Sequence, residues 1–208
     1  MKYRIKYIII RVSRKKEAVM KRELIYRTFS NIPVLHTDRL TLRKMKASDA
    51  ADMFEYASLA QTTRYLTWRP HKNREYTKEY LEYLGTRYAT GDFYDWALTL
   101  DSEGGKMIGT CGFTRFDTQN DCAEIGYVLN PAYHGQGLAV EAAKEVIRFG
   151  FEVLGLHRIE AKYIVGNTAS RRVMEKLGMS FEGEHKDAIK VGGAYRSIGV
   201  CSIISDSH

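Results

Sequence analysis

The segment Pro131-Ala-Tyr-His-Gly-Gln-Gly-Leu-Ala-Val-Glu-Ala142 decides the fold, because it runs from the end of an apolar strand into the longest amphipathic helix. Gly135 and Gly137 have no Cβ atom, so the backbone there can approach a ligand closely. The first N–H groups of the helix lack partners inside it, and the positive end of the helix dipole points the same way. Such a helix end attracts anions. The segment therefore predicts a phosphate cradle; the alternative is a loop whose glycines only turn the chain.

Alternating patterns on both sides place this segment in a sheet. In the preceding strand, 121–129, one face carries Ala123, Ile125, Tyr127 and Leu129, and the other carries Glu124, Gly126 and Val128. Residues 157–165 alternate again, so strand, helix and strand predict a parallel, right-handed crossover. A short helix follows from Asn167 to Ser170 onward and is closed by Gly178.

The remaining periodic segments extend this unit in both directions. Helical spacing predicts helices over 49–60 and 74–88, and alternation predicts strands over 34–43, 93–100, 107–116, 179–184 and 195–204. Neither a repeat nor a linker interrupts the order. We therefore expect an α/β (α+β) domain with a single mixed, mostly antiparallel sheet of about six or seven strands and helices on both faces.

Length and composition limit the class of protein. A chain of 208 residues with 44% hydrophobic and 27% charged residues is typical of one soluble globular domain. No apolar run approaches the ~18 residues of a membrane span, so we expect no membrane partner. Cys111, Cys122 and Cys201 lie far apart and form no CxxC pair. Buried, inert thiols in a reducing cytoplasm are therefore expected.

The net charge of +7 comes from one end of the chain. Residues 1–30 hold ten Lys or Arg against two Glu, a net +8, whereas the remainder holds 22 basic and 23 acidic residues, a net −1. A near-neutral body argues against nucleic-acid binding by the core. The apolar run at 7–10 is too short for a signal peptide. We predict that 1–32 is a basic extension, disordered, poorly packed or the result of a start codon upstream of Met20, and that 33–208 is the domain.

Competing motifs are weaker. Gly135-x-Gly137 is two-thirds of a dinucleotide fingerprint and Glu160 has the spacing of its ribose-binding acid, but Val140 occupies the third glycine position. Three antiparallel strands also precede it, where the fingerprint requires a repeated βαβ array. Walker and Gly-x-Ser-x-Gly sequences are missing, and the six histidines show no metal-ligand spacing, so we expect no metal site.

Three motifs in order resemble the acetyl-CoA-binding motifs of the GNAT acetyltransferases: His134-Gly-Gln-Gly-Leu-Ala139, Arg158-Ile-Glu160, and Asn167-Thr-Ala-Ser170 with Glu175-Lys-Leu-Gly178. The resemblance spans about 33–204 and is strongest to the RimJ/RimL type of ribosomal-protein N-acetyltransferase, which also begins with a strand like Arg39 to Arg43. It implies a sheet splayed between the strands of Glu124 and Glu160, with the pantetheine arm in the gap and the pyrophosphate on the amides of 135–140. The implied cofactor contacts are Val128, Leu129, His134, Gly135, Gln136, Gly137, Leu138, Ala139, Val140, Asn167 and Ser170. One departure is His134, where the family usually has Gln or Arg.

Transfer of an acetyl group from acetyl-CoA to an amine, with coenzyme A as product, needs a base, an oxyanion donor and a proton source for the thiolate. Glu124 is the candidate base, acting through water, and a backbone N–H near Val128 or Leu129 is the candidate oxyanion donor. The tyrosine that protonates the thiolate in many family members is replaced by Met174, so the resemblance assigns this role to Ser170. The alternatives are a surface carboxylate for Glu124 and a helix-start hydroxyl for Ser170. Asn167 should hold the pantetheine amide or the region of the acyl group; the alternative is an Asn that only forms the turn.

The acceptor is the least determined part. Trp68, Arg69 and Glu124, with the Gly192-Gly193 turn, are expected to border it. An α-amine, with a pKa of ~8, is neutral far more often at pH 7 than a lysine amine of pKa ~10.4. The candidate acceptors are a protein N-terminal α-amine, such as that of a ribosomal protein, and a small-molecule amine. The protein itself is expected to be a monomer or a homodimer. The other class of function is a cofactor-binding module with this fold and little catalysis.

Overall fold

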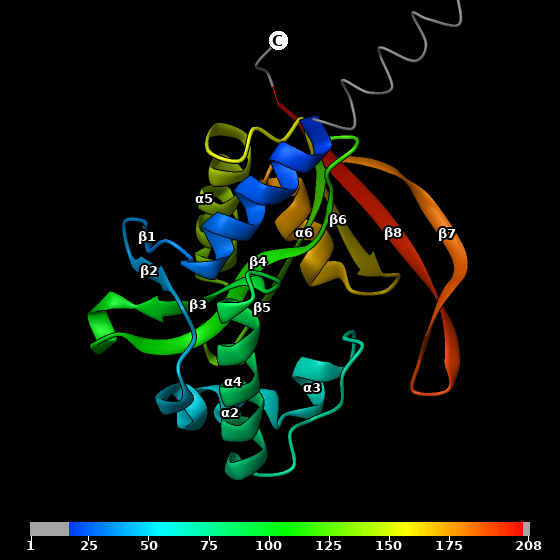
Figure 1. The fold of residues 1–208 in the computed structure, drawn as a ribbon. Helices are drawn as coiled ribbons and strands as arrows, with labels where there is room; N and C mark the ends of the chain where they lie inside the picture. Colours follow the sequence, from blue (N-terminus) through cyan, green and yellow to red (C-terminus); the bar gives the residue numbers. More distant parts are fainter. Residues whose placement is uncertain (1–16, 206–208) are drawn as a thin grey trace, which may run out of the picture.

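The computed structural model describes residues 17–205 and contains one sheet with strand order β1-β2-β3-β4-β5-β6-β8-β7 (Figure 1). The strands are β1 (Leu35–His36), β2 (Leu40–Arg43), β3 (Tyr94–Leu100), β4 (Lys106–Asp117), β5 (Cys122–Leu129), β6 (Arg158–Ile164), β7 (Ser180–Val191) and β8 (Ala194–Ile204). Its eight strands are close to the predicted number, and the mixed, mostly antiparallel sheet is confirmed.

Helices cover both faces of this sheet. They are α2 (Ala50–Ala57), α3 (Ala60–Thr63), α4 (Arg74–Ala89), α5 (Leu138–Glu152) and α6 (Thr168–Lys176), with short 3₁₀ turns at Ala47–Asp49, Asp101–Glu103 and Pro131–Tyr133. Helix α5 packs on β2, β4 and β5, while α2 and α4 pack together and α2 contacts β4 (Figure 1). The face under α5 is apolar and the opposite face carries the polar groups described below.

The sheet divides between β5 and β6. Within residues 17–205 these two strands make the one parallel pairing, in register from Cys122 with Arg158 to Ile125 with Ala161. Beyond that point β5 continues to Leu129 and β6 to Ile164, but they no longer pair. The expected splay is therefore present, and it leaves β5 backbone groups without a strand partner on the β6 side.

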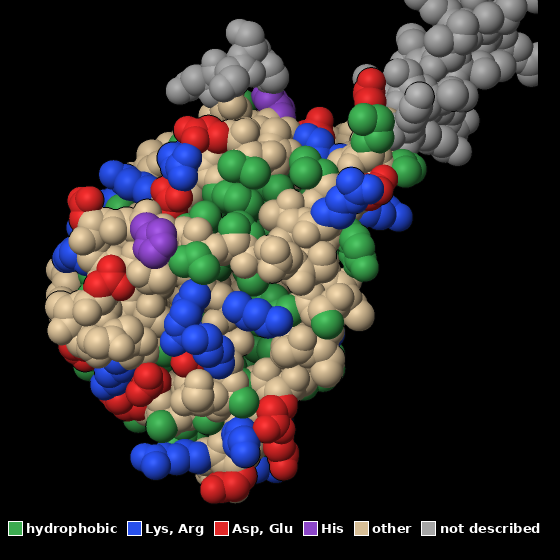
Figure 2. All heavy atoms as spheres, turned by 60° about the vertical axis from the view of Figure 1, so that its left-hand side comes forward, with side chains coloured by type: hydrophobic (Ala, Val, Ile, Leu, Met, Phe, Trp, Pro, Cys, Tyr) green, Lys and Arg blue, Asp and Glu red, His purple; other side chains and the backbone are tan. Residues whose placement is uncertain are grey.

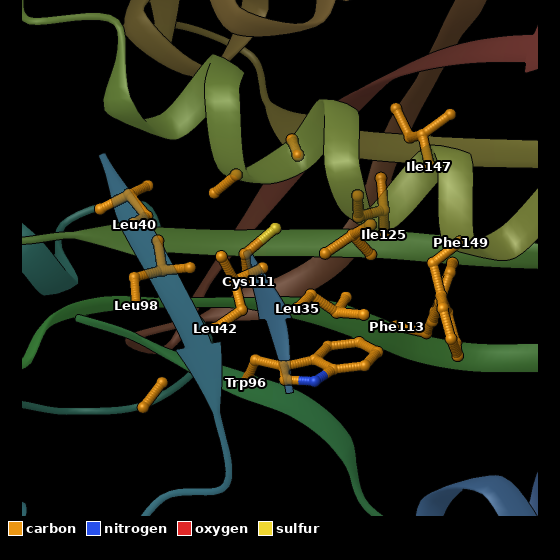
Figure 3. Close-up of a cluster of buried hydrophobic side chains, with 14 of the residues drawn as sticks. Leu35, Leu40, Leu42, Trp96, Leu98, Cys111, Phe113, Ile125, Ile147 and Phe149 are labelled. Carbon is orange, nitrogen blue, oxygen red and sulfur yellow. The ribbon is translucent and has the colours of Figure 1, made fainter. Parts of the chain in front are cut away.

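The main core lies between the sheet and α5. Trp96, Leu98, Cys111 and Ile125 point from the sheet towards Ile147 and Phe149 of α5 or the neighbouring core (Figure 3). Alternation along each strand puts these side chains on one face, as the sequence pattern indicates. Burial of this face fixes the strand register, and so fixes which residues face the opposite side.

The basic extension differs from the prediction over its second half. A helix at 17–30 packs into the core, where Phe29 is fully buried and makes edge contacts with Tyr94 and Trp96, with ring centroids 5.0 and 5.4 Å apart. Lys21 donates to the carbonyl of Gly155 and forms an ion pair with Asp121 at 2.8 Å. The sequence did not predict this helix, because its buried Ile25 and Phe29 are outnumbered by charged, solvated residues. Residues 1–16, which held the rest of that prediction, lie outside the described residues.

Smaller differences occur at element boundaries. The strand expected over 34–43 is divided by a turn in which the Thr37 N–H bonds the Leu40 carbonyl at 2.9 Å, and the helix expected over 49–60 ends at Ala57 before α3 begins. Strand β7 runs beyond the predicted end at 184 because bulges at 181–183 and 185–189 keep it paired with β8.

Acidic and basic side chains are interspersed over the face seen in Figure 2, in keeping with the near-neutral charge of the chain outside its first 30 residues. Among the described helices, none has both the length and the hydrophobicity of a membrane span.

Candidate active site

A pocket of about 1170 Å³ lies where β5 and β6 separate. Its walls come from the loop before α5, from β5 and β6, from the start of α6, and from α2 to α4 with the loop 65–72. This volume exceeds the ~300–1,000 Å³ of ordinary single-ligand pockets. It is therefore large enough for two ligands side by side.

The glycine segment forms one end of the pocket. Gly135 and Gly137 have φ values of +79° and +80°, which residues other than glycine rarely adopt. Gly137 is the N-cap of α5. No side chain caps this helix end, and a Cβ added to Gly135 would meet nothing of the protein within 4 Å. Exposed N–H donors at the start of a 15-residue helix fit a pyrophosphate group. The cradle thus matches the ligand that the sequence resemblance implies.

Arg39 supports this cradle from the turn just before β2. Its guanidinium donates to the Gln136 carbonyl at 3.0 Å and to the Glu141 carboxylate at 2.7 Å, and its backbone N–H bonds the same carboxylate at 2.9 Å. The Gln136 carbonyl is therefore directed to Arg39. Gln136 does not line the pocket, in contrast to its predicted neighbours, which do: His134, Gly135, Gly137, Leu138, Ala139 and Val140.

His134 connects the cradle to the end of β5. Its Nε2 lies 3.0 Å from the Leu129 carbonyl oxygen, a distance that fits a hydrogen bond donated by the ring. Val128 and Leu129 line the pocket just beyond the last pairing with β6. Backbone donors at this position are suited to hold charge on a carbonyl oxygen.

Glu124 lies on the pocket wall but already has a partner. Its Oε2 is 2.5 Å from Lys162 Nζ, and the same nitrogen is 3.8 Å from Glu160 Oε2. Glu124 and Glu160 are register neighbours on the parallel pair, so Lys162 bridges two adjacent carboxylates. Any ammonium group that approached Glu124 would compete with Lys162.

Ser170 lies opposite β5 at the start of α6. The Asn167 side-chain oxygen accepts from the Ser170 N–H at 3.2 Å, so Asn167 caps the helix and its amide nitrogen remains for the pocket. The Ser170 hydroxyl is 3.1 Å from the Tyr127 hydroxyl, which is also 3.0 Å from the Ser170 carbonyl. Met174 is buried one turn further on and also lines the pocket.

Tyr127 was not singled out from the sequence as a site residue. Burial raises the pKa of its hydroxyl, so this hydroxyl stays protonated. It faces the pocket because the sheet splays just before it. The available signal was a tyrosine on the strand that the resemblance places against the cofactor.

Asp95 was also missed. Burial raises its carboxyl pKa to about 7, and hydrogen bonds from the Thr110 side chain and the Trp96 N–H offset part of this effect. It lines the same pocket, on the face towards α2 and α4. The sequence feature that could have indicated Asp95 is an acidic residue between two aromatic residues, Tyr94 and Trp96, inside the predicted strand 93–100.

Some of the residues predicted to border the acceptor line the pocket, and others do not. Half-buried Trp68 and exposed Arg69 both line the pocket. The Gly192-Gly193 turn is the tip of the β7–β8 hairpin and does not line it; Ile189 and Ile198 of the same hairpin do.

Cys111, Cys122 and Cys201 are unpaired, and burial raises the pKa of each. In residues 17–205, no group of three His, Cys, Asp or Glu side chains is arranged to hold a metal ion.

A mixed sheet splayed beside a helix that begins at a glycine, with a pocket in the gap, agrees with the acetyl-CoA-binding architecture that the sequence resemblance implies. The family model described as an acetyltransferase (GNAT) domain matches residues 39–180, and the chain belongs to this family. It is 34% identical to the uncharacterized N-acetyltransferase p20 of Bacillus licheniformis, over 84% of this chain and 97% of that protein. It is 27% identical to the [ribosomal protein uS5]-alanine N-acetyltransferase of Escherichia coli, over 80% and 89%. The chain is thus an acyltransferase, and the resemblance to the RimJ/RimL branch is supported.

Solved structures agree with this assignment. A GNAT-family acetyltransferase from Bacillus anthracis superposes with a TM-score of 0.73 at 30% identity, covering 83% of this chain and 98% of that one. The microcin C7 self-immunity acetyltransferase MccE, solved with acetyl-CoA and AMP, gives a TM-score of 0.73 at 20% identity, covering 81% and 94%, and shows the shared fold.

Proposed function

We propose that the protein transfers the acetyl group of acetyl-CoA to a primary amine by direct attack while both substrates are bound. The observation that carries this proposal is that one pocket contains the glycine cradle, the start of α6 and an open acceptor side reaching α2 and α4. Acetyl-CoA supplies an activated thioester when it is bound. The residues of this chain bind it, orient the amine and move protons.

Binding would rest on the backbone of 135–140, with Arg39 holding the cradle in place through the Gln136 carbonyl and Glu141. The amide nitrogen of Asn167 would hold the pantetheine arm, since its oxygen is used by the α6 cap. A backbone N–H near Val128 or Leu129 would stabilise the negative charge on the carbonyl oxygen.

Two side chains were assigned to proton transfer from the sequence, and both contact the pocket. Ser170 would protonate the leaving thiolate, and the Tyr127 hydroxyl, 3.1 Å from the Ser170 hydroxyl and donating to the Ser170 carbonyl, would hold Ser170 in position. Glu124 would accept a proton from the amine through water, once Lys162 shares or releases its carboxylate. Proton transfers of this kind are typically worth ~10²–10⁴ in rate.

The acceptor class comes from relatives and chemistry together. Two similar proteins are named as ribosomal-protein acetyltransferases, from Escherichia coli and Vibrio cholerae. A protein N-terminal α-amine is therefore the first acceptor to test, with small-molecule amines next, and a reducing cytoplasm is the compartment that suits three unpaired thiols.

A panel of amine acceptors, including N-terminal peptides of ribosomal proteins, tests the proposal when amide formation and thiol release are both measured. We expect one acetylated amine for each thiol released. The Glu124→Gln variant should bind acetyl-CoA as wild type does and turn over more slowly. Wild-type protein that binds acetyl-CoA but acetylates no amine would instead support the cofactor-binding module.

A further inference from the structure

Three buried side-chain oxygens in residues 17–205 have no hydrogen-bond partner: Asp95 Oδ1, the Tyr56 hydroxyl and Thr62 Oγ1. All three residues line the active-site pocket, and they come from three elements, β3, α2 and α3. Buried polar groups are nearly always paired with protein, water or a ligand, so unpaired ones that line a single pocket point to polar partners inside it. A ligand that donates hydrogen bonds can pair with all three oxygens.

The backbone leaves space for Asp95 to face this ligand. Asp95 is opposite Gly112 on β4, and Gly112 is opposite Gly126 on β5, so the three residues share one face of the sheet. A Cβ on Gly112 would lie 2.8 Å from Asp95 Oδ1, which shows that the carboxylate leans over β4. Adjacent strands are ~4.8 Å apart, so the carboxylate stands roughly one strand spacing from β5 where the sheet opens. Both glycines line the pocket between Asp95 and the end of β5.

The charges around the pocket single out Asp95. Among the described residues that line it, the carboxylates are Asp95 and Glu124, and the cations are Arg69, Lys72, Lys162, Arg172 and Lys176. Lys162 already pairs with Glu124. Within the part of the chain that the structure describes, no Lys or Arg nitrogen lies within 4.0 Å of Asp95. The titratable groups that respond to its charge are neutral at pH 7: Tyr56, Tyr80, Tyr88 and Cys111. Asp95 is therefore an acid with aromatic surroundings and no counter-ion.

We propose that this end of the pocket is the acceptor subsite, in which Asp95 binds the acceptor's primary ammonium group and takes one of its protons. The Tyr56 and Thr62 oxygens accept from the remaining N–H groups. This inference rests on the proposed amine acetylation. It adds Asp95 to the proposed proton path as the group that takes the first ammonium proton, ahead of Glu124, which is paired with Lys162.

The proton count is complete. A primary ammonium group loses two protons when it becomes an amide. One N–H bond breaks as an O–H bond forms on Asp95, and the nitrogen keeps the electron pair that attacks the thioester carbon. The second proton leaves with the thiolate, through Ser170, to give coenzyme A. Asp95 then returns its proton to water.

The group has suitable acidity for this exchange. Burial raises the pKa of Asp95 to about 7, near the value at which a general base works best at neutral pH. A bound ammonium group favours the ionised carboxylate, so ammonium binding and ionisation of Asp95 support each other.

The test combines turnover with an independent binding measurement. Asp95→Asn should lower kcat/KM for the best amine by at least ~10²-fold, more than Glu124→Gln does, while acetyl-CoA binds within about twofold of wild type. Asp101→Asn, an exposed acid just after β3, is the matched control and should keep wild-type turnover. Separately, carboxyl ¹³C NMR follows the Asp95 titration with coenzyme A present, with Asp95→Asn identifying the signal. We expect n-butylammonium chloride to lower its apparent pKa, and 1-butanol to leave it unchanged.

Each outcome decides the proposal. Turnover by Asp95→Asn within about threefold of wild type, or an Asp95 titration that n-butylammonium does not move, overturns it. If wild-type protein acetylates no amine, the proposed function fails, and the NMR titration still shows whether the ammonium subsite exists. Tyr56→Phe supplies a second variant: weaker n-butylammonium binding supports the subsite, and unchanged binding removes Tyr56 from it.

Discussion

Replacement of Asp95 by Asn should stabilise the protein at neutral pH, although it removes a proposed catalytic group. The pKa of Asp95 is raised from 3.8 to about 7 in the folded protein, so the fold favours the protonated form. The folded state binds more protons than the unfolded state between these values, and stability therefore falls as the pH rises through this window. Three pKa units at 1.36 kcal/mol each give a cost of up to about 4 kcal/mol above pH 7. Asparagine carries no charge and escapes this cost.

Urea unfolding at pH 5 and pH 8 measures this effect. The gain in unfolding free energy from Asp95→Asn should be about 2–3 kcal/mol larger at pH 8 than at pH 5, because most of the ionisation cost arises between them. Asp101→Asn, at an exposed site, should change stability by less than about 0.5 kcal/mol at either pH. A destabilised Asp95→Asn variant at pH 8, or a difference that does not depend on pH, would refute the reasoning.

Three further predictions follow from the geometry. Gly137→Ala and Gly104→Ala each place a Cβ at a positive φ, +80° and +65°, so each variant should lose about 1–2 kcal/mol of stability. Only Gly137→Ala should weaken coenzyme A binding, by about tenfold or more as measured by calorimetry. Equal coenzyme A affinity in the two variants would show that the glycine cradle is not part of the binding site. Phe29→Ala should cost about 3–5 kcal/mol in urea unfolding, and Leu24→Ala on the exposed side of the same helix far less; similar losses would contradict core packing of that helix. Tyr127→Phe and Ser170→Ala should each lower kcat and leave acetyl-CoA affinity unchanged. The kcat of the double variant should be little lower than that of either single variant, because the two hydroxyls act as a pair. Additive losses in kcat would show that the two hydroxyls act independently.

Much of the fold follows from local pattern. Alternation in 121–129 and 157–165, with an amphipathic helix between them, was enough to predict the parallel crossover, whereas the splay was implied by the family resemblance. The glycine cradle was predictable for the same reason, because positive φ and a free helix end are both local properties.

The acceptor side of the site was not predictable in this way. Asp95 acquires its role from Gly112 and Gly126, which are distant in sequence and meet it only through strand register. The ion pair of Glu124 with Lys162 likewise depends on the parallel pairing of β5 with β6. The helix at 17–30 was not predicted because charged residues dominate its composition, while Phe29 contacts aromatic residues of three other segments, β3, β4 and α5.

The most direct test of the account is mass-spectrometric detection of the acetylated acceptor, with thiol release measured in the same reaction. Wild-type protein given acetyl-CoA and N-terminal peptides or small primary amines should form one amide for each coenzyme A released, and Asp95→Asn should form the same product far more slowly. Thiol release without an acetylated amine, or no turnover although acetyl-CoA binds at the glycine cradle, would contradict the assignment as an amine acetyltransferase.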